Sequence, residues 1–117
     1  MAPRPGRQPG PWLIHIKPLG AFASRTSRVE LISCAIDWTR TPVTTGWAAT
    51  TISELAQGRF RLGSGALPDA WNRDWHDIAY ERPVELVGDF VAATRAAWGS
   101  RPGAPVRHDG PFYRYRE

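Results

Sequence analysis

Hydrophobic and polar positions along this chain predict strands alternating with helices from residue 28 onward. The segment RVELISCAI, residues 28–36, is short, almost continuously apolar and rich in β-branched side chains. Such a run is typical of a strand buried on both faces of a parallel sheet. A second strand is predicted over RFRLGSG, residues 59–65, where Phe60 and Leu62 share one face and two glycines stand at the tip.

Two helices are predicted beside these strands. The first covers residues 42–57, with Thr41 as its N-cap, Pro42 at its first position and Gly58 as a left-handed stop. The second begins near Pro83 and ends at residues 99–102. The apolar stripes expected along them consist of Val43, Trp47, Thr51 and Leu55 on the first helix, and of Val84, Val87, Val91, Thr94 and Trp98, widened by Leu86, Phe90 and Ala97, on the second.

The remaining segments are less regular in pattern. Residues 12–27 are compatible with the end of a helix or with coil, and residues 65–81 predict a long polar loop. The last twelve residues, VRHDGPFYRYRE, predict a hairpin that turns at Asp109 and Gly110. Strands that alternate with helices indicate an α/β protein, and the right-handed crossover rule makes the two strands neighbours or near-neighbours in one parallel sheet.

Composition and charge separate the two ends of the chain. The 117 residues are enough for one small domain or for part of a larger one. The formal charge of +4 comes from the first 28 residues, which hold five basic and no acidic side chains. We therefore expect residues 1–27 to be a basic, Pro/Gly-rich and poorly ordered leader, and residues 28–117 to be the folded domain. Such a leader can contact nucleic acid, but a solvated segment is the favoured interpretation.

Cysteine and histidine usage argues against a disulfide framework and against a metal site. The single cysteine, Cys34, lies in an apolar strand and is expected to be a buried, inert thiol. The three histidines are far apart and show no metal-ligand spacing, so no metal is predicted. Without a signal peptide or an apolar run of about 20 residues, a cytoplasmic protein is expected.

The strand tips are the candidate binding site, because ligands in α/β folds meet the carboxyl ends of strands. These tips are Ser33–Cys34–Ala35–Ile36 and Gly63–Ser64–Gly65. Glycine there allows a ring or phosphate to approach the backbone, or it supplies a turn with positive φ, and the pattern leaves both open. Ser64 does not lie in a hydrolase elbow, and no catalytic residue is assigned. The acidic loop with Asp69, Asp74, Asp77 and Glu81 is more typical of a solvated loop than of a lid.

Three stretches in the expected order resemble the luciferase-like flavin or deazaflavin oxidoreductases. The first is RVELISCAIDWTRTPVTTGWAATTISELAQGRFRLGSGA, with its G-R-F-x-L-G-x-G element. The others are RPVELVGDFVAATRAAW and the hairpin VRHDGPFYRY, and together they cover residues 28–116. Ile32 stands where the family usually has glycine, so packing of this strand is expected to differ.

The resemblance implies a partial (β/α)8 TIM barrel with about two parallel strand–helix units and a C-terminal hairpin. It places coenzyme F-420, a deazaflavin, or FMN against Ser33, Cys34, Ala35, Gly63, Ser64 and Gly65. It also implies a bulge with a non-prolyl cis peptide at Ser33–Cys34. The complete barrel needs about 250 residues.

We therefore expect a truncated flavin- or deazaflavin-dependent oxidoreductase or monooxygenase that acts on a small organic substrate and is inactive alone. The alternative is a non-catalytic remnant that self-associates as a homo-oligomer or pairs with a complementary barrel fragment. Neither a membrane nor a nucleic-acid partner is favoured.

Overall fold

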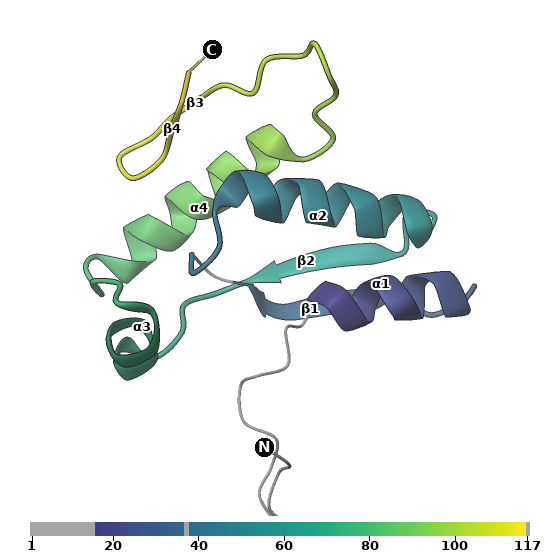
Figure 1. The fold of residues 1–117 in the computed structure, drawn as a ribbon, viewed down its shortest axis with the longest axis horizontal. Helices are drawn as coiled ribbons and strands as arrows, with labels where there is room; N and C mark the ends of the chain where they lie inside the picture. Colours follow the sequence, from purple (N-terminus) through teal and green to yellow (C-terminus); the bar gives the residue numbers. More distant parts are fainter. Residues whose placement is uncertain (1–15, 37, 117) are drawn as a thin grey trace, which may run out of the picture.

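The computed structural model describes residues 16–36 and 38–116 and places helices beside a small parallel sheet (Figure 1). The elements in chain order are α1 (Ile16–Arg25), β1 (Leu31–Ile36), α2 (Pro42–Leu55), β2 (Phe60–Ser64), α3 (Asp69–His76), α4 (Pro83–Ala97), β3 (His108–Asp109) and β4 (Arg114–Tyr115). Within the described ranges, none of the helices has the length and apolar character needed to cross a bilayer.

Strands β1 and β2 are parallel neighbours, which confirms the predicted strand–helix–strand unit. Leu31 lies opposite Phe60 and Ser33 lies opposite Leu62. The register then shifts and resumes only where Ile36 lies opposite Ser64. This irregularity confirms the expected bulge at the end of β1, whereas the cis peptide stays a prediction.

Helix α2 lies between α1 and α4 and packs against both of them (Figure 1). Thr41 caps its first turn by accepting a hydrogen bond from the Thr44 amide, and the stop at Gly58 has φ +82°, so both predicted signals are confirmed. The predicted apolar stripe is wrong, because Trp47 is 54% and Leu55 49% exposed.

The buried face of α2 consists mostly of small residues, which is why the predicted apolar stripe does not coincide with it. The buried positions are Pro42, Thr45, Gly46, Ala49 and Ile52. A Cβ atom on Gly46 would lie 2.9 Å from both the Cβ of Ala97 and the carbonyl oxygen of Thr94. Helices α2 and α4 therefore approach closely through small side chains, and the large ones point outward.

Helix α4 follows the predicted stripe only in part. Leu86, Phe90, Thr94 and Ala97 are buried as expected, but Val84 is 85% exposed at the start of the helix. The buried face also contains Asp89, which hydrophobic periodicity did not select.

One face of the parallel sheet is open, which corrects the prediction that the first strand is buried on both faces. Leu31 and Ser33 are buried, whereas Ile32 is 57% exposed and Cys34 is also exposed. Successive side chains of a strand point to opposite faces, and no described element covers the face that carries Ile32 and Cys34. The predicted buried thiol is therefore wrong.

The open face begins with an ion pair. Arg61 Nη2 lies 3.0 Å from Glu30 Oε1, and both side chains are exposed. The hydrogen bond and the positive charge of Arg61 hold the pKa of Glu30 below its usual range.

Helix α1 resolves the ambiguous segment upstream of the sheet. It lies inside residues 1–27, which the sequence analysis set apart as a leader, and residues 1–15 lie outside the described ranges. The Arg59 guanidinium donates hydrogen bonds to the carbonyl oxygens of Ala23, Thr26 and Val29 and to the Thr26 hydroxyl. A residue at the start of β2 thus satisfies carbonyls at the end of α1 and holds the helix beside the sheet.

The C-terminal hairpin confirms the predicted turn and depends on Asp89. Strands β3 and β4 pair antiparallel, with Asp109 opposite Arg114. The Asp89 carboxylate, whose side chain is 4% exposed, accepts hydrogen bonds from the amides of Phe112 and Tyr113 and lies 2.6 Å from Nε2 of His108. Burial by itself would raise the pKa of Asp89, but these bonds outweigh burial and lower it.

Glycine-to-alanine variants test the close approach of the two helices. Gly46→Ala should lower the free energy of unfolding by about 1–3 kcal/mol, because the added methyl group overpacks the contact with α4. Gly88→Ala is the matched control inside α4, where an added Cβ meets nothing within 4 Å. It should raise stability by about 0.5–1 kcal/mol, since alanine favours helix more than glycine. Urea unfolding followed by circular dichroism measures both, and equal effects would contradict the packing described.

Asp89→Asn tests the hairpin anchor. It should cost about 1.5–3 kcal/mol, because hydrogen bonds to a charged acceptor are lost and an amide group faces backbone donors. The lowered pKa of Asp89 stabilises the fold above the ordinary aspartate pKa of about 3.9, and this stabilisation is lost as pH falls through the folded-state pKa.

The decrease in the free energy of unfolding as the pH falls should therefore be smaller in Asp89→Asn than in the wild type. The control is Asp109→Asn, which removes an exposed ion pair with Arg114 and should change stability by less than about 1 kcal/mol. Unfolding curves from pH 2 to 7 that coincide in shape for the wild type and Asp89→Asn would refute the assignment.

Candidate functional site

The carboxyl ends of β1 and β2 are held together by the Ser33 hydroxyl, and the absence of a side chain at Gly63 allows them to approach. The Ser33 hydroxyl accepts a hydrogen bond from the Gly63 amide at 3.0 Å and donates one to the Gly63 carbonyl at 3.3 Å. A Cβ atom on Gly63 would overlap the carbonyl oxygen of Ser33. Gly63 is therefore required by the approach of its neighbouring strand. Its φ is not positive, so the turn interpretation does not hold for this residue.

The bulge interrupts the pairing of the two strands at the tip of β1. In the recorded register Ser33 and Ile36 have partner residues on β2, whereas Cys34 and Ala35 between them have none. The Cys34 side chain is exposed on the open face. Amide and carbonyl groups in a bulge at a strand end are suited to bind the polar edge of a planar ligand.

Helix α3 lies beyond the ends of these strands, in the segment that was predicted to be a loop (Figure 1). Its fully buried Asn72 ties it to the chain that follows β1. The Trp38 indole donates to Asn72 Oδ1 at 2.8 Å, and Asn72 Nδ2 donates to the carbonyls of Leu67 and Pro68 at 3.0 and 3.1 Å. Hydrophobic periodicity did not predict this helix, because polar residues dominate it. The available signal was the spacing of two tryptophans four residues apart behind Asp69.

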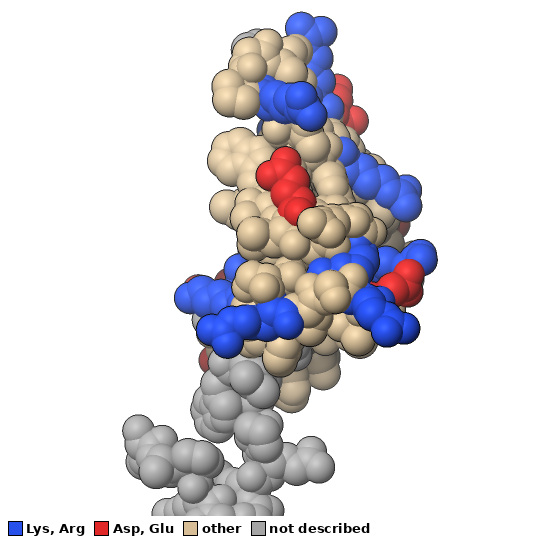
Figure 2. Space-filling view, turned by 90° about the vertical axis from the view of Figure 1, so that its right-hand side faces the viewer, with Lys and Arg blue, Asp and Glu red and all other residues tan. Residues whose placement is uncertain are grey.

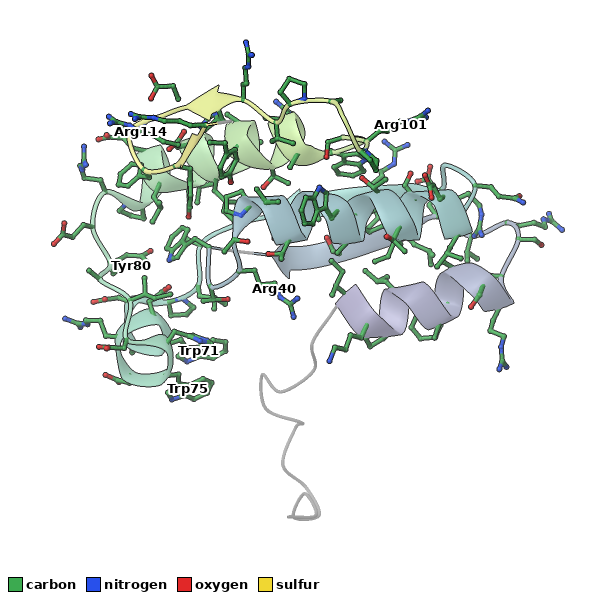
Figure 3. The ribbon with its side chains drawn as sticks, turned by 45° about the horizontal axis from the view of Figure 1, so that its top comes forward. Arg40, Trp71, Trp75, Tyr80, Arg101 and Arg114 are labelled. Carbon is green, nitrogen blue, oxygen red and sulfur yellow. The ribbon has the colours of Figure 1, made fainter. Side chains whose placement is uncertain are left out.

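Those two tryptophans form an aromatic pair beside the tips. Trp71 and Trp75 stack with ring centroids 5.1 Å apart and an interplanar angle of 9°. Both project from α3 on the side where Arg40 extends from the loop between β1 and α2 (Figure 3). The proximity of these tryptophans to Arg40 was not predicted from the sequence.

The other candidates from the sequence do not gather into a catalytic cluster. In residues 16–36 and 38–116, no group of three or more His, Cys, Asp or Glu side chains is arranged to hold a metal ion. Of the acidic loop, Asp69 pairs with Arg73 at 2.8 Å. Asp74, Asp77 and Glu81 are all exposed.

The opposite end of the molecule carries scattered charge. Figure 2 shows basic side chains spread over this surface with acidic ones among them, and they do not merge into one continuous basic area. The strand tips, the bulge and the tryptophan pair on α3 are therefore the best candidate site in the described part of the chain.

Comparison with known proteins identifies a family and several relatives. A family model described as luciferase-like monooxygenase matches residues 9–117. A putative coenzyme F420-dependent oxidoreductase, Rv3520c of Mycobacterium tuberculosis, is 31% identical over 98 residues, which are 83% of this chain and 28% of the relative. A phthiodiolone/phenolphthiodiolone dimycocerosates ketoreductase from Mycobacterium sp. strain JLS is 31% identical over 110 residues, 92% of this chain and 27% of the relative.

A solved structure shows the same fold. The crystal structure of monooxygenase RslO1 from Streptomyces bottropensis superposes with a TM-score of 0.73 at 24% identity, over 86% of this chain and 30% of that one. The chain thus spans less than a third of the length of each of these proteins.

Proposed function

Because this chain belongs to the luciferase-like monooxygenase family, we propose that it contributes the cofactor-facing strand tips of a flavin- or deazaflavin-dependent oxidoreductase acting on a small organic substrate. The observation that carries the proposal is the bulge at Cys34 and Ala35, which lies beside the tip of a parallel neighbour. The main chain there supplies hydrogen-bonding groups at the edge of the sheet where α/β proteins bind ligands.

The tip residues have different parts in this proposal. Ser33 and Gly63 bond to each other, so they position the strands and do not bind the ring themselves. Cys34, Ala35, Ser64 and Gly65 follow them toward the open edge and would lie against the cofactor. A bound flavin or deazaflavin would supply the hydride chemistry, while the protein binds and orients the ring.

Coenzyme F-420 is the cofactor that we propose first, with FMN as the second choice. The support is the similarity to Rv3520c, a putative coenzyme F420-dependent oxidoreductase that matches 83% of this chain.

A titration with both cofactors tests this proposal through Cys34. The wild-type chain should bind coenzyme F-420 or FMN, and Cys34→Phe should weaken binding at least tenfold because its ring occupies space at the exposed strand tip. Cys34→Ser keeps the small side chain and is the matched control, with binding within a factor of two of wild type. Cofactor fluorescence measures the dissociation constants.

Two results would count against the proposal. One is the absence of binding of either cofactor to a wild-type chain that is folded by circular dichroism. The other is equal affinity of the wild type and Cys34→Phe, which would place the ring elsewhere.

The open sheet face favours a second candidate function, in which the chain by itself is inactive and pairs with another copy or with a complementary barrel fragment. Ile32 is 57% exposed on this face, and β1 and β2 form a sheet of only two strands among the described residues. Exposed apolar surface and free strand edges promote association.

Ile32→Lys tests that candidate. If the open face mediates pairing, the charge should shift the chain from dimer or higher oligomer to monomer, because a buried unpaired lysine is costly. Val84→Lys is the control, since Val84 is 85% exposed on α4 and lies outside the sheet. Sedimentation velocity at several concentrations gives the oligomeric state. A wild-type monomer at all of them would rule out self-association.

A further inference from the structure

The tryptophan pair on α3 leaves a large aromatic surface in water. Trp75 is 55% exposed, and its only recorded ring partner among the described residues is Trp71. Trp38, in contrast, is 6% exposed, donates its indole hydrogen to Asn72 and lies 6.0 Å from the ring of Tyr80. Exposed aromatic surface of this kind commonly marks a binding site.

The surroundings of the pair place it at the candidate site. Asn72 follows Trp71 directly and is bonded to Trp38, which lies two residues before Arg40. The same buried amide therefore fixes both the helix that carries the tryptophans and the loop that carries the arginine. Figure 3 shows the two indole rings projecting from α3 toward the side on which Arg40 lies, next to the strand ends.

Arg40 supplies a cation that the rest of the described chain does not neutralise. Its guanidinium makes no hydrogen bond or ion pair with any described residue. Of the acids on α3, Asp69 is already paired with Arg73. Asp74 is turned by one residue step, about 100° around the helix axis, from Trp75. An anionic group that contacts Arg40 would therefore meet an unshared charge.

We propose that Trp71, Trp75 and Arg40 form the substrate-binding wall of this site, and that the substrate is a planar aromatic molecule with a carboxylate or similar anionic group. The ring stacks on the exposed indole face, and the anion pairs with Arg40. This inference rests on the proposed function, since it assigns the substrate class of the oxidoreductase whose cofactor binds at the strand tips.

Isothermal titration calorimetry with three small molecules tests the proposal on the full chain. 2-Naphthoate, which is planar and anionic, should bind measurably. 2-Naphthamide lacks the charge and cyclohexanecarboxylate lacks the flat ring, so each should bind at least fivefold more weakly. Trp75→Ala should weaken 2-naphthoate binding about tenfold, the change expected from loss of one stacking ring. Arg40→Gln should weaken 2-naphthoate but leave 2-naphthamide unchanged.

Conservative and distant variants separate binding from folding. Trp75→Phe keeps an aromatic surface and should restore binding to within about threefold of wild type. Trp47→Ala removes an equally exposed tryptophan, whose indole donates to Ser100 on another part of the surface, and should have no effect. Arg101→Gln, in the segment that follows α4 and far from Arg40 in Figure 3, is the control for Arg40→Gln and should have no effect.

The outcomes distinguish this inference from the proposed function. No binding of 2-naphthoate, or equal binding by Trp75→Ala and wild type, overturns the inference even when coenzyme F-420 or FMN binds. Simple competition between 2-naphthoate and the cofactor also overturns it, because the tryptophans would then hold the cofactor ring. Conversion of a dimer to a monomer by Trp75→Ala would overturn it as well, by assigning the pair to an interface. Binding of 2-naphthoate with the predicted variant pattern supports it whether or not a cofactor binds.

Discussion

The close approach of Ser33 and Gly63 is the contact on which the site depends. The Ser33 hydroxyl bonds to both main-chain groups of Gly63, and its carbonyl occupies the space of a side chain at that position. This contact fixes the parallel strands immediately before the register shifts. The bulge therefore begins from a rigid base, so that main chain beyond it is presented at the sheet edge in a defined position.

Three polar side chains, of which Asn72 and Asp89 are buried, hold the surrounding elements against this sheet. Arg59 binds the end of α1, Asn72 joins α3 to the loop after β1, and Asp89 holds the hairpin on α4. Each of the three bonds mostly to main-chain groups, which would otherwise lack partners where the chain leaves regular structure. Polar contacts thus define where the loops lie, while apolar contacts hold the helices and strands together.

Local signals in the sequence were sufficient to predict the order of the helices and strands. Tertiary contacts determined which face of each helix is buried. Thr41 with Pro42, Gly58, and the turn at Asp109 act within a few residues, so their positions could be predicted. The buried face of α2 could not, because Gly46 is selected by the proximity of α4 and not by helical periodicity. The strand tips were identified correctly as neighbours. The placement of Trp71 and Trp75 relative to Arg40 could not be predicted, because it depends on the hydrogen bond between Asn72 and Trp38, which are 34 positions apart.

The open face of the sheet changes character along the strands. Glu30 and Arg61 form a hydrated ion pair at its amino end, and Ile32 and Cys34 follow toward the carboxyl end. Withdrawing two charges from water is costly, whereas covering an aliphatic side chain is favourable. A partner that binds this face therefore has a preferred orientation. Its polar end lies over the hydrated ion pair, and its apolar end lies over Ile32 and Cys34. The difference between the two ends of the face thus selects one of the two possible orientations of a bound partner.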